Sequence, residues 1–178
     1  MKIGIDVSQI AYEGTGVAGL TTNLVKKLLE IDKKNEYVFF FSSLRKNLKS
    51  QISNLRFTSQ NLKIKTFKFP PSLLDLLWNK WHVLPIEWLI GDVDLFITSD
   101  WTEPPVLKAK KATILYDLIV YKYPNETDRK IVEVQKRKLK WVKKESEIIF
   151  CISESTKRDA IEILKIEDKR LEVIYPGI

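Results

Sequence analysis

Hydrophobic and polar positions follow two different periods along the chain. Short, largely apolar runs are typical of buried strands, and they occupy residues 2–7, 36–43, 62–69, 93–100, 111–118, 147–153 and 170–175. In other segments apolar residues recur every three or four positions, which predicts amphipathic helices over 17–31, 128–145 and 154–165. Strands alternating with helices predict an α/β domain, a Rossmann-like open and mainly parallel sheet with helices on both faces.

The predicted helices carry apolar faces that we expect to pack on this sheet. The first helix has a stripe made of Leu20, Leu24, Leu28 and Ile31. The basic helix 128–145 has a stripe made of Val132, Gln135, Leu139 and Val142, and its lysines, Lys138 among them, are expected to be solvated. Residues 72–90 hold three tryptophans and are expected to form a core helix capped by Ser72; the alternative is a helix at a membrane interface. His82 is expected to be partly buried and hydrogen-bonded rather than catalytic.

Length, composition and charge set the class of protein. The 178 residues suit one domain, and 44% hydrophobic with 30% charged residues is typical of a globular chain. A single cysteine excludes an internal disulfide, and with a single histidine it argues against a zinc site. Met1-Lys2 runs directly into the first strand, so no signal peptide is expected and a cytoplasmic location is favoured. The net charge of +7 favours anionic partners without choosing among them.

Gly14, Gly16 and Gly19 are spaced as G-x-G-x-x-G before the first helix, the fingerprint of a dinucleotide-binding loop. Two features of the context disfavour NAD. The segment DVSQIAYE makes the loop too long, and the second strand ends in Phe41-Ser42-Ser43 without a carboxylate for the ribose. What remains is a helix N-terminus suited to an anion, with Gly16 allowing close approach, or else a simple tight turn.

Several segments, taken in order, resemble the N-terminal lobe of family 4 (group 1) retaining glycosyltransferases, which have the GT-B fold. They are IGID, TGVAGLTTNLVKKLLEID, EYVFFFSS, VDLFITSDWTEPP, ATILYDLIVYKYPNE and EIIFCISESTKRDAIEIL, followed by VIYPGI. The resemblance spans the chain and is least distinctive over 44–71. It implies that residues 1–178 form an acceptor-side domain. A second, donor-binding domain with a pair of glutamates would be missing after the final Pro-Gly turn.

The resemblance also implies a set of site residues. Thr15 and Gly16 would lie near the diphosphate of the donor, although Ala18 and Gly19 depart from the usual glycine pattern. Tyr116 and Asp117 stand where many members have His-Asp, so they are the candidate catalytic residues. A tyrosine there can donate a hydrogen bond but cannot act as an imidazole base near neutral pH. The alternatives are that Tyr116 packs under a loop and that Asp117 caps a turn.

Candidate acceptor-binding residues follow two other strands. Asp100, Trp101 and Glu103 lie in SDWTEPP, where the indole offers a flat face to a sugar and the carboxylates can accept hydrogen bonds from hydroxyls. Ser153 follows the strand EIIFCI. The alternatives are that Trp101 plugs the loop against the core and that Ser153 caps the next helix.

The resulting hypothesis is a glycosyltransferase that moves a hexosyl group from a nucleotide-diphosphate sugar to the hydroxyl of a sugar or lipid-linked sugar, in cell-surface polysaccharide or glycolipid synthesis. No metal or cofactor is expected, and the chain alone is expected to be inactive. The rival hypotheses are a freestanding acceptor-binding or scaffold module, an NAD-dependent oxidoreductase and a two-lobed epimerase. The basic helix suggests peripheral contact with an anionic membrane. No nucleic acid is expected, because no recognition motif accompanies the basic residues.

Overall fold

A seven-stranded, all-parallel sheet organises the computed structural model, which describes residues 1–44, 61–99 and 101–176. The strands are β1 (Lys2–Asp6), β2 (Glu36–Ser42), β3 (Leu62–Phe67), β4 (Leu95–Thr98), β5 (Lys110–Leu115), β6 (Ile148–Cys151) and β7 (Leu171–Val173). Their spatial order is β3-β2-β1-β4-β5-β6-β7, so the order reverses between β1 and β4. The predicted Rossmann-like fold class is confirmed. Residues 45–60, within the stretch 44–71 where the resemblance is least distinctive, lie outside the described residues.

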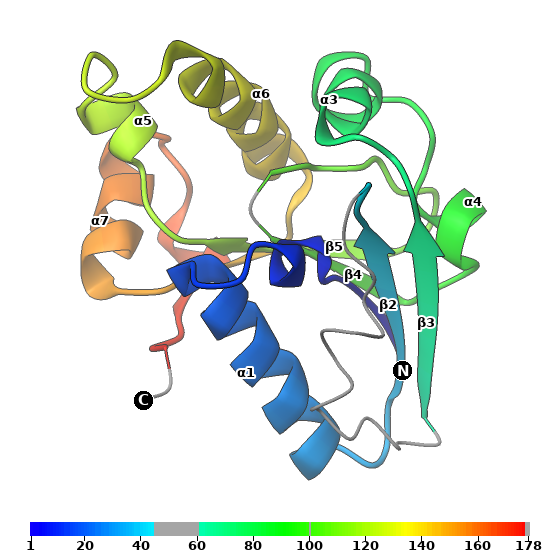
Figure 1. Ribbon diagram of the computed structural model, residues 1–178. Coiled ribbons are helices and arrows are strands. Elements are labelled where there is room, and N and C mark those ends of the chain that lie inside the picture. The colour runs from blue at the N-terminus through cyan, green and yellow to red at the C-terminus, as the bar shows by residue number, and fades with distance from the viewer. Residues whose placement is uncertain (45–60, 100, 177–178) are drawn as a thin grey trace.

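Helices cover both faces of the sheet, as predicted. The α-helices are α1 (Gly16–Ile31), α3 (Pro71–Leu74), α4 (Glu87–Ile90), α5 (Ile119–Lys122), α6 (Arg129–Glu145) and α7 (Glu154–Glu162). Short 3₁₀ turns form η1 (Ser8–Ala11) and η3 (Asp168–Arg170), and η2 (Asp75–Lys80) is π-helical. Figure 1 shows α1 on one side of the sheet and α3 and α6 on the other. Among the described residues, no helix has the length and apolar character needed to cross a bilayer.

The apolar run of β2 fills two cores at once. Phe39 and Phe41 pack with Val25 of α1 on one face, whereas Phe40 packs with Trp78 of η2 on the other. Successive side chains of a strand point to opposite faces, so a strand buried on both sides needs a continuous apolar run. Each such side chain contributes about 1.5–3 kcal/mol when it is fully buried. This central strand therefore joins the two helical layers.

The apolar face predicted for α1 is wrong by one position. The buried residues of the helix are Ala18, Thr21, Val25 and Leu29. Of the predicted stripe, Ile31 is 76% exposed, and Leu20 and Leu24 are only half-buried. One residue corresponds to about 100° of rotation around a helix. Leu20 and Leu24 therefore line a cleft described below, whereas Leu28 packs against the core.

Segment 71–90 also differs from its prediction. It forms two short helices with a π-helical turn between them rather than one core helix. Trp78 is fully buried, but Trp81 and Trp88 are 59% and 68% exposed. Ser72 does not cap a helix, because α3 begins one residue earlier at Pro71. Proline suits a first helical position, where the missing N–H has no intrahelical partner.

Candidate functional site

A cleft of about 620 Å³ runs between α1 and the carboxyl ends of β5, β6 and β7. Its walls include Gly16, Leu20, Leu24, Tyr116, Asp117 and Ile174. Gly16 and the Tyr116-Asp117 pair are far apart in the sequence, yet the fold brings them into one space. The carboxyl ends of parallel strands are where open α/β sheets bind ligands. The cleft, which we call the α1 cleft, is the candidate functional site.

The start of α1 turns its first backbone N–H groups toward the α1 cleft at Gly16 and Val17. The Thr15 hydroxyl caps the helix, accepting a 3.2 Å hydrogen bond from the Ala18 N–H and donating at 2.9 Å to the Tyr12 carbonyl. The first N–H groups of a helix have no intrahelical partners, and no acidic residue lies in this first turn. Gly16 is exposed, and a Cβ added there would meet no atom within 4 Å. The fold itself therefore does not require a glycine at this position.

Tyr116 is held in place by hydroxyl groups from two other elements. Its hydroxyl oxygen lies 2.8 Å from Ser99 Oγ, after β4, and 3.4 Å from Thr21 Oγ1 of α1. Its backbone carbonyl accepts a 2.9 Å hydrogen bond from the Thr156 hydroxyl. The half-buried ring thus both packs between elements and lines the α1 cleft. Its catalytic role stays a prediction.

Asp117 is exposed at the mouth of the same cleft. One carboxylate oxygen, Oδ1, accepts a 3.0 Å hydrogen bond from the Ile119 N–H at the start of α5. The alternative that Asp117 caps a turn is therefore correct for Oδ1. Asp117 nevertheless lines the α1 cleft, and its role as a site residue stays a prediction.

The predicted acceptor residues do not gather in the α1 cleft. Asp100 lies outside the described residues. Trp101 is half-buried and lines a separate hollow, where its carbonyl accepts a 2.9 Å hydrogen bond from Asn79 Nδ2. Ser153 caps α7, accepting from the Thr156 N–H at 3.1 Å, as the capping alternative proposed. An acceptor contact by Ser153 stays a prediction.

Glu103 is a correction to the sequence analysis. Its side chain is completely buried, with hydroxyl donors from Thr98 at 2.6 Å and Thr113 at 3.1 Å on Oε2. The Lys111 ammonium lies 2.9 Å from Oε1 as an ion pair. A carboxylate placed in this way cannot meet a ligand in a cleft. Glu103 is an internal structural group.

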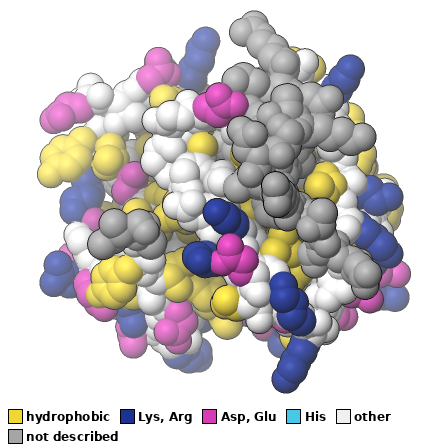
Figure 2. All heavy atoms as spheres, turned by 60° about the horizontal axis from the view of Figure 1, so that its bottom comes forward, with side chains coloured by type: hydrophobic (Ala, Val, Ile, Leu, Met, Phe, Trp, Pro, Cys, Tyr) yellow, Lys and Arg dark blue, Asp and Glu magenta, His cyan; other side chains and the backbone are white. Residues whose placement is uncertain are grey.

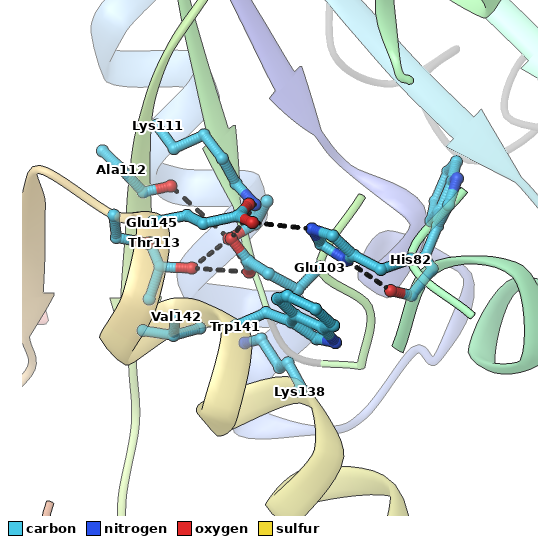
Figure 3. A network of polar contacts seen from close by, with 12 residues as sticks. His82, Glu103, Lys111, Ala112, Thr113, Lys138, Trp141, Val142 and Glu145 are labelled. Atoms are coloured by element: carbon cyan, nitrogen blue, oxygen red, sulfur yellow. Dashed lines mark hydrogen bonds and ion pairs between the residues drawn. The ribbon is translucent and has the colours of Figure 1, made fainter. Parts of the chain in front are cut away.

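The ion pair continues into a longer network, which Figure 3 shows from close by. The Lys111 ammonium also lies 3.0 Å from Glu145 Oε2, and Glu145 Oε1 lies 2.9 Å from His82 Nε2. The His82 ring stacks on Trp141 with 3.6 Å between centroids. Burial raises the pKa of Glu145, but the neighbouring Lys111 and His82 charges outweigh it and hold that pKa below its usual range. The network fastens α6 to β5 and to the turn after η2.

His82 is partly buried and hydrogen-bonded, as predicted, and it belongs to this network rather than to the α1 cleft. Its Nδ1 lies 2.8 Å from the Trp78 carbonyl, and its Nε2 faces the Glu145 carboxylate. Both partners are acceptors, so both contacts are hydrogen bonds only when the ring carries two protons.

Sequence reasoning missed two charged residues that are buried next to the sheet. Asp6 ends β1 and is 2% exposed; burial raises its pKa against the opposing effect of hydrogen bonds from Ser8. Lys138 is also 2% exposed and donates from Nζ to the Ser99 carbonyl, whereas we expected it to be solvated. Its signal was its position inside the apolar stripe of α6, next to Leu139.

The structure agrees with the two arguments against a dinucleotide site. The turn η1 stands between β1 and α1, and β2 ends at Ser42. The Ser42 hydroxyl donates to the Phe69 carbonyl at 3.1 Å, and the described residues that end β2 and follow it, as far as residue 44, include no Asp or Glu. Within the described ranges, no group of three or more His, Cys, Asp or Glu side chains is arranged to hold a metal ion.

Comparison with known proteins shows little beyond the architecture. No protein-family model and no curated protein matches the chain. Among solved structures, the chain is similar to a short-chain dehydrogenase from Oenococcus oeni PSU-1. That match covers 99% of this chain and 80% of the other, with 15% identity and a TM-score of 0.37. A likeness this distant carries no argument about function.

Proposed function

We propose that the chain is the acceptor-side domain of a retaining glycosyltransferase with the GT-B fold. With a facing donor-binding domain, it would transfer a hexosyl group from a nucleotide-diphosphate sugar to an acceptor hydroxyl in cell-surface polysaccharide or glycolipid synthesis. The observation that carries this proposal is the α1 cleft, in which Gly16 meets Tyr116 and Asp117. The ordered sequence resemblance supports the choice of family.

The first turn of α1 would serve the departing diphosphate. Negative charge grows on that group as the bond to the sugar breaks, and fixed N–H donors stabilise it without having to reorganise. The open space beside Gly16 lets a phosphate oxygen approach the backbone. Lys27 lies further along the same cleft and adds a positive charge.

Tyr116 and Asp117 would position the sugar and the acceptor. The contact with Ser99 at 2.8 Å fixes the Tyr116 hydroxyl, which gives a directed hydrogen bond rather than a mobile one. Asp117 would accept a hydrogen bond from the incoming hydroxyl. Neither role needs an imidazole base at position 116.

Ligand titration of the ¹⁵N-labelled chain by NMR tests this proposal. UDP, GDP and NAD⁺ serve as separate probes. We expect saturable shifts at the Gly16 and Val17 amides with a nucleoside diphosphate, and smaller shifts with NAD⁺. Gly19→Ala is the matched control for Gly16→Ala, because both glycines are exposed in α1 with room for a Cβ. Shifts confined to the surface of α6, or shifts equally reduced by both variants, would contradict the proposal.

A sugar-transfer assay distinguishes the glycosyltransferase from a non-catalytic acceptor-binding or scaffold module. The chain alone should transfer no sugar from UDP-glucose or GDP-mannose to a methyl glycoside, because the donor-binding domain is needed to complete the reactive centre. Sugar transfer by the isolated chain would reject that division of labour. Absence of transfer by a longer protein that holds both domains would favour a non-catalytic acceptor-binding module.

We also propose that the basic face of α6 contacts an anionic membrane. Its exposed basic residues are Arg129, Lys130, Lys136, Lys140, Lys143 and Lys144. Trp141 ties this helix to η2 through a 2.8 Å hydrogen bond to the Asn79 carbonyl, two residues before the exposed Trp81. The face drawn in Figure 2 has no such concentration of positive charge, because basic, acidic and apolar side chains are interspersed there. Sedimentation with phosphatidylglycerol vesicles, but not with phosphatidylcholine vesicles, is the expected result; equally negligible binding to both would reject the contact.

A further inference from the structure

The turn that follows η2, residues 81–84, has a strained backbone. His82 and Leu84 have positive φ angles of 55° and 67°, in the left-handed region that residues other than glycine rarely adopt. Such conformations persist only where the surroundings fix them, and they are concentrated at functional sites and switches. Trp81 and Val83, on either side of His82, are 59% and 46% exposed, so burial of these two side chains does little to fix the turn.

Backbone hydrogen bonds fix the turn only in part. The Trp81 N–H donates to the Leu76 carbonyl at 3.0 Å, and the Val83 N–H donates to the Leu77 carbonyl at 2.8 Å. Both acceptors belong to η2, so these bonds tie the turn to the helical segment that directly precedes it. The His82 side chain adds a connection to a different element, α6.

The partners of the His82 ring suit its charged form. Nδ1 lies 2.8 Å from the Trp78 carbonyl, and Nε2 lies 2.9 Å from Glu145 Oε1 (Figure 3). A neutral imidazole has one N–H, so one of its nitrogens would turn a lone pair toward an acceptor. The Trp141 ring lies nearly parallel to the imidazole, at 6°, and the face of an indole attracts a cation. Loss of one ring proton therefore replaces one of the two hydrogen bonds by a repulsive contact.

The other charges nearby leave this preference in place. The charged groups on the elements packed around the ring are Asp75 and Lys80 of η2, Glu103, Lys111 of β5, and Arg137, Lys138, Lys140, Lys144 and Glu145 of α6. Lys80, Lys140 and Lys144 are exposed, so solvent screens their repulsion of a positive ring. Lys111 contacts two carboxylates, which offset its charge. Glu145 is the charged group that touches the ring.

We infer that residues 81–84 form a proton-operated turn, which the imidazolium of His82 fastens to α6 and which loss of one ring proton releases. Histidine changes its charge between about pH 5 and 8, so we expect the release within that range. Relief of the strain at His82 and Leu84 then favours other backbone conformations. Trp81 and Val83 move with the turn, which changes the apolar surface next to Trp141. The turn lies outside the α1 cleft, so its release does not depend on the proposed function.

His82 is the single histidine of the chain, which makes the test direct. After incorporation of ring-¹⁵N histidine, the imidazole NMR signals come from His82 alone and report its ring protons from about pH 5 to about pH 8. The turn is followed by the Trp81 indole signal, assigned through Trp81→Phe, and by hydrogen exchange at the Val83 N–H, with each rate divided by the intrinsic rate at that pH.

Both measurements should give one midpoint. We expect two ring N–H groups at the acid end, and a loss of protection at Val83 of about tenfold or more as one ring proton is lost. A ring that loses its proton without any change at Val83 would overturn the inference. So would a ring that keeps both protons throughout this pH range.

His82→Asn tests whether the ring is the group that operates the turn. Asparagine tolerates the left-handed region but does not titrate, so the backbone is accommodated while the switch is removed. Protection at Val83 should then be independent of pH. An unchanged pH dependence in this variant would assign the effect to another group and overturn the inference.

Glu145→Gln changes the switch without removing the ring. The substitution keeps the size of the side chain and removes the charge that faces Nε2, so His82 should lose its proton at a lower pH, and Val83 protection should fall at that same lower pH. Glu147→Gln is the matched control, because Glu147 pairs with Lys110 at an exposed site, and it should leave both midpoints unchanged. A shifted ring midpoint with an unshifted turn would overturn the inference, and this comparison decides the matter if His82→Asn does not fold.

Discussion

Lys111 offers the sharpest test of how the site is supported. Its ammonium is 1% exposed and bridges Glu103 and Glu145, at 2.9 and 3.0 Å respectively. Lys111→Met keeps the length of the side chain and removes the charge. Glu103 would then remain buried with the hydroxyl donors of Thr98 and Thr113 but without a cation.

The expected loss follows from that placement. Breaking a buried ion pair from one side leaves an uncompensated charge, and measured costs of this kind are about 3–5 kcal/mol. The whole domain is expected to be stable by only about 5–15 kcal/mol. Glu145 is 25% exposed on its side chain and keeps His82, so most of the loss comes from Glu103. The double variant Lys111→Met with Glu103→Gln should recover about 2 kcal/mol or more, because no charge then stays buried unpaired.

Urea unfolding followed by tryptophan fluorescence measures both variants, with Lys110→Met as the control. Lys110 is the adjacent residue of β5 and pairs with Glu147 at a similar 3.0 Å, but both side chains are more than half exposed. Its loss should cost less than about 1 kcal/mol. If Lys111→Met proves no more destabilising than Lys110→Met, the buried network does not fasten α6 to β5 as described.

Three further predictions concern separate parts of the fold. Gly16→Ala should keep or raise the free energy of unfolding, by up to about 1 kcal/mol, and yet weaken diphosphate binding; retained affinity would show that the glycine serves no ligand. Burial raises the pKa of Asp6 above 3.8, because the charged carboxylate is poorly solvated inside the protein. The buried charge therefore lowers the free energy of unfolding at neutral pH, and this cost disappears in acid, where the carboxyl is protonated. Asp6→Asn should therefore be more stable than wild type in neutral urea titrations and should lose that advantage in acid. Burial also raises the pKa of the Cys151 thiol to about 11, so Ellman's reagent should react only after unfolding, and rapid labelling of the native protein would disagree.

The fold could be predicted from the sequence because its central strands are buried on both sides. A run such as Tyr37 to Phe41 fits few positions other than the middle of a parallel sheet. The face of α1 could not be predicted in the same way. Periodicity identifies an apolar stripe but does not say whether a core or a cleft lies against it, so Leu20 and Leu24 were assigned to the wrong environment.

Charged residues inside the protein were the least predictable part. Glu103 finds its partners in elements that only the tertiary structure brings together, so its sequence neighbours gave no reason to bury it. Lys138 stands beside Leu139 in the apolar stripe of α6, but its partner, the Ser99 carbonyl, is likewise supplied by the tertiary structure. Gly16, Tyr116 and Asp117 could be selected beforehand because a resemblance ordered them along the chain, and the fold then placed them in one cleft.

The central claim is that the first turn of α1 and the end of β5 form one site for the diphosphate of a nucleotide sugar. A crystal structure of the protein with UDP or GDP tests it most directly. The account predicts phosphate oxygens within hydrogen-bond distance of the Gly16 and Val17 N–H groups. A nucleotide bound instead at the basic surface of α6, away from Gly16 and Tyr116, would contradict it.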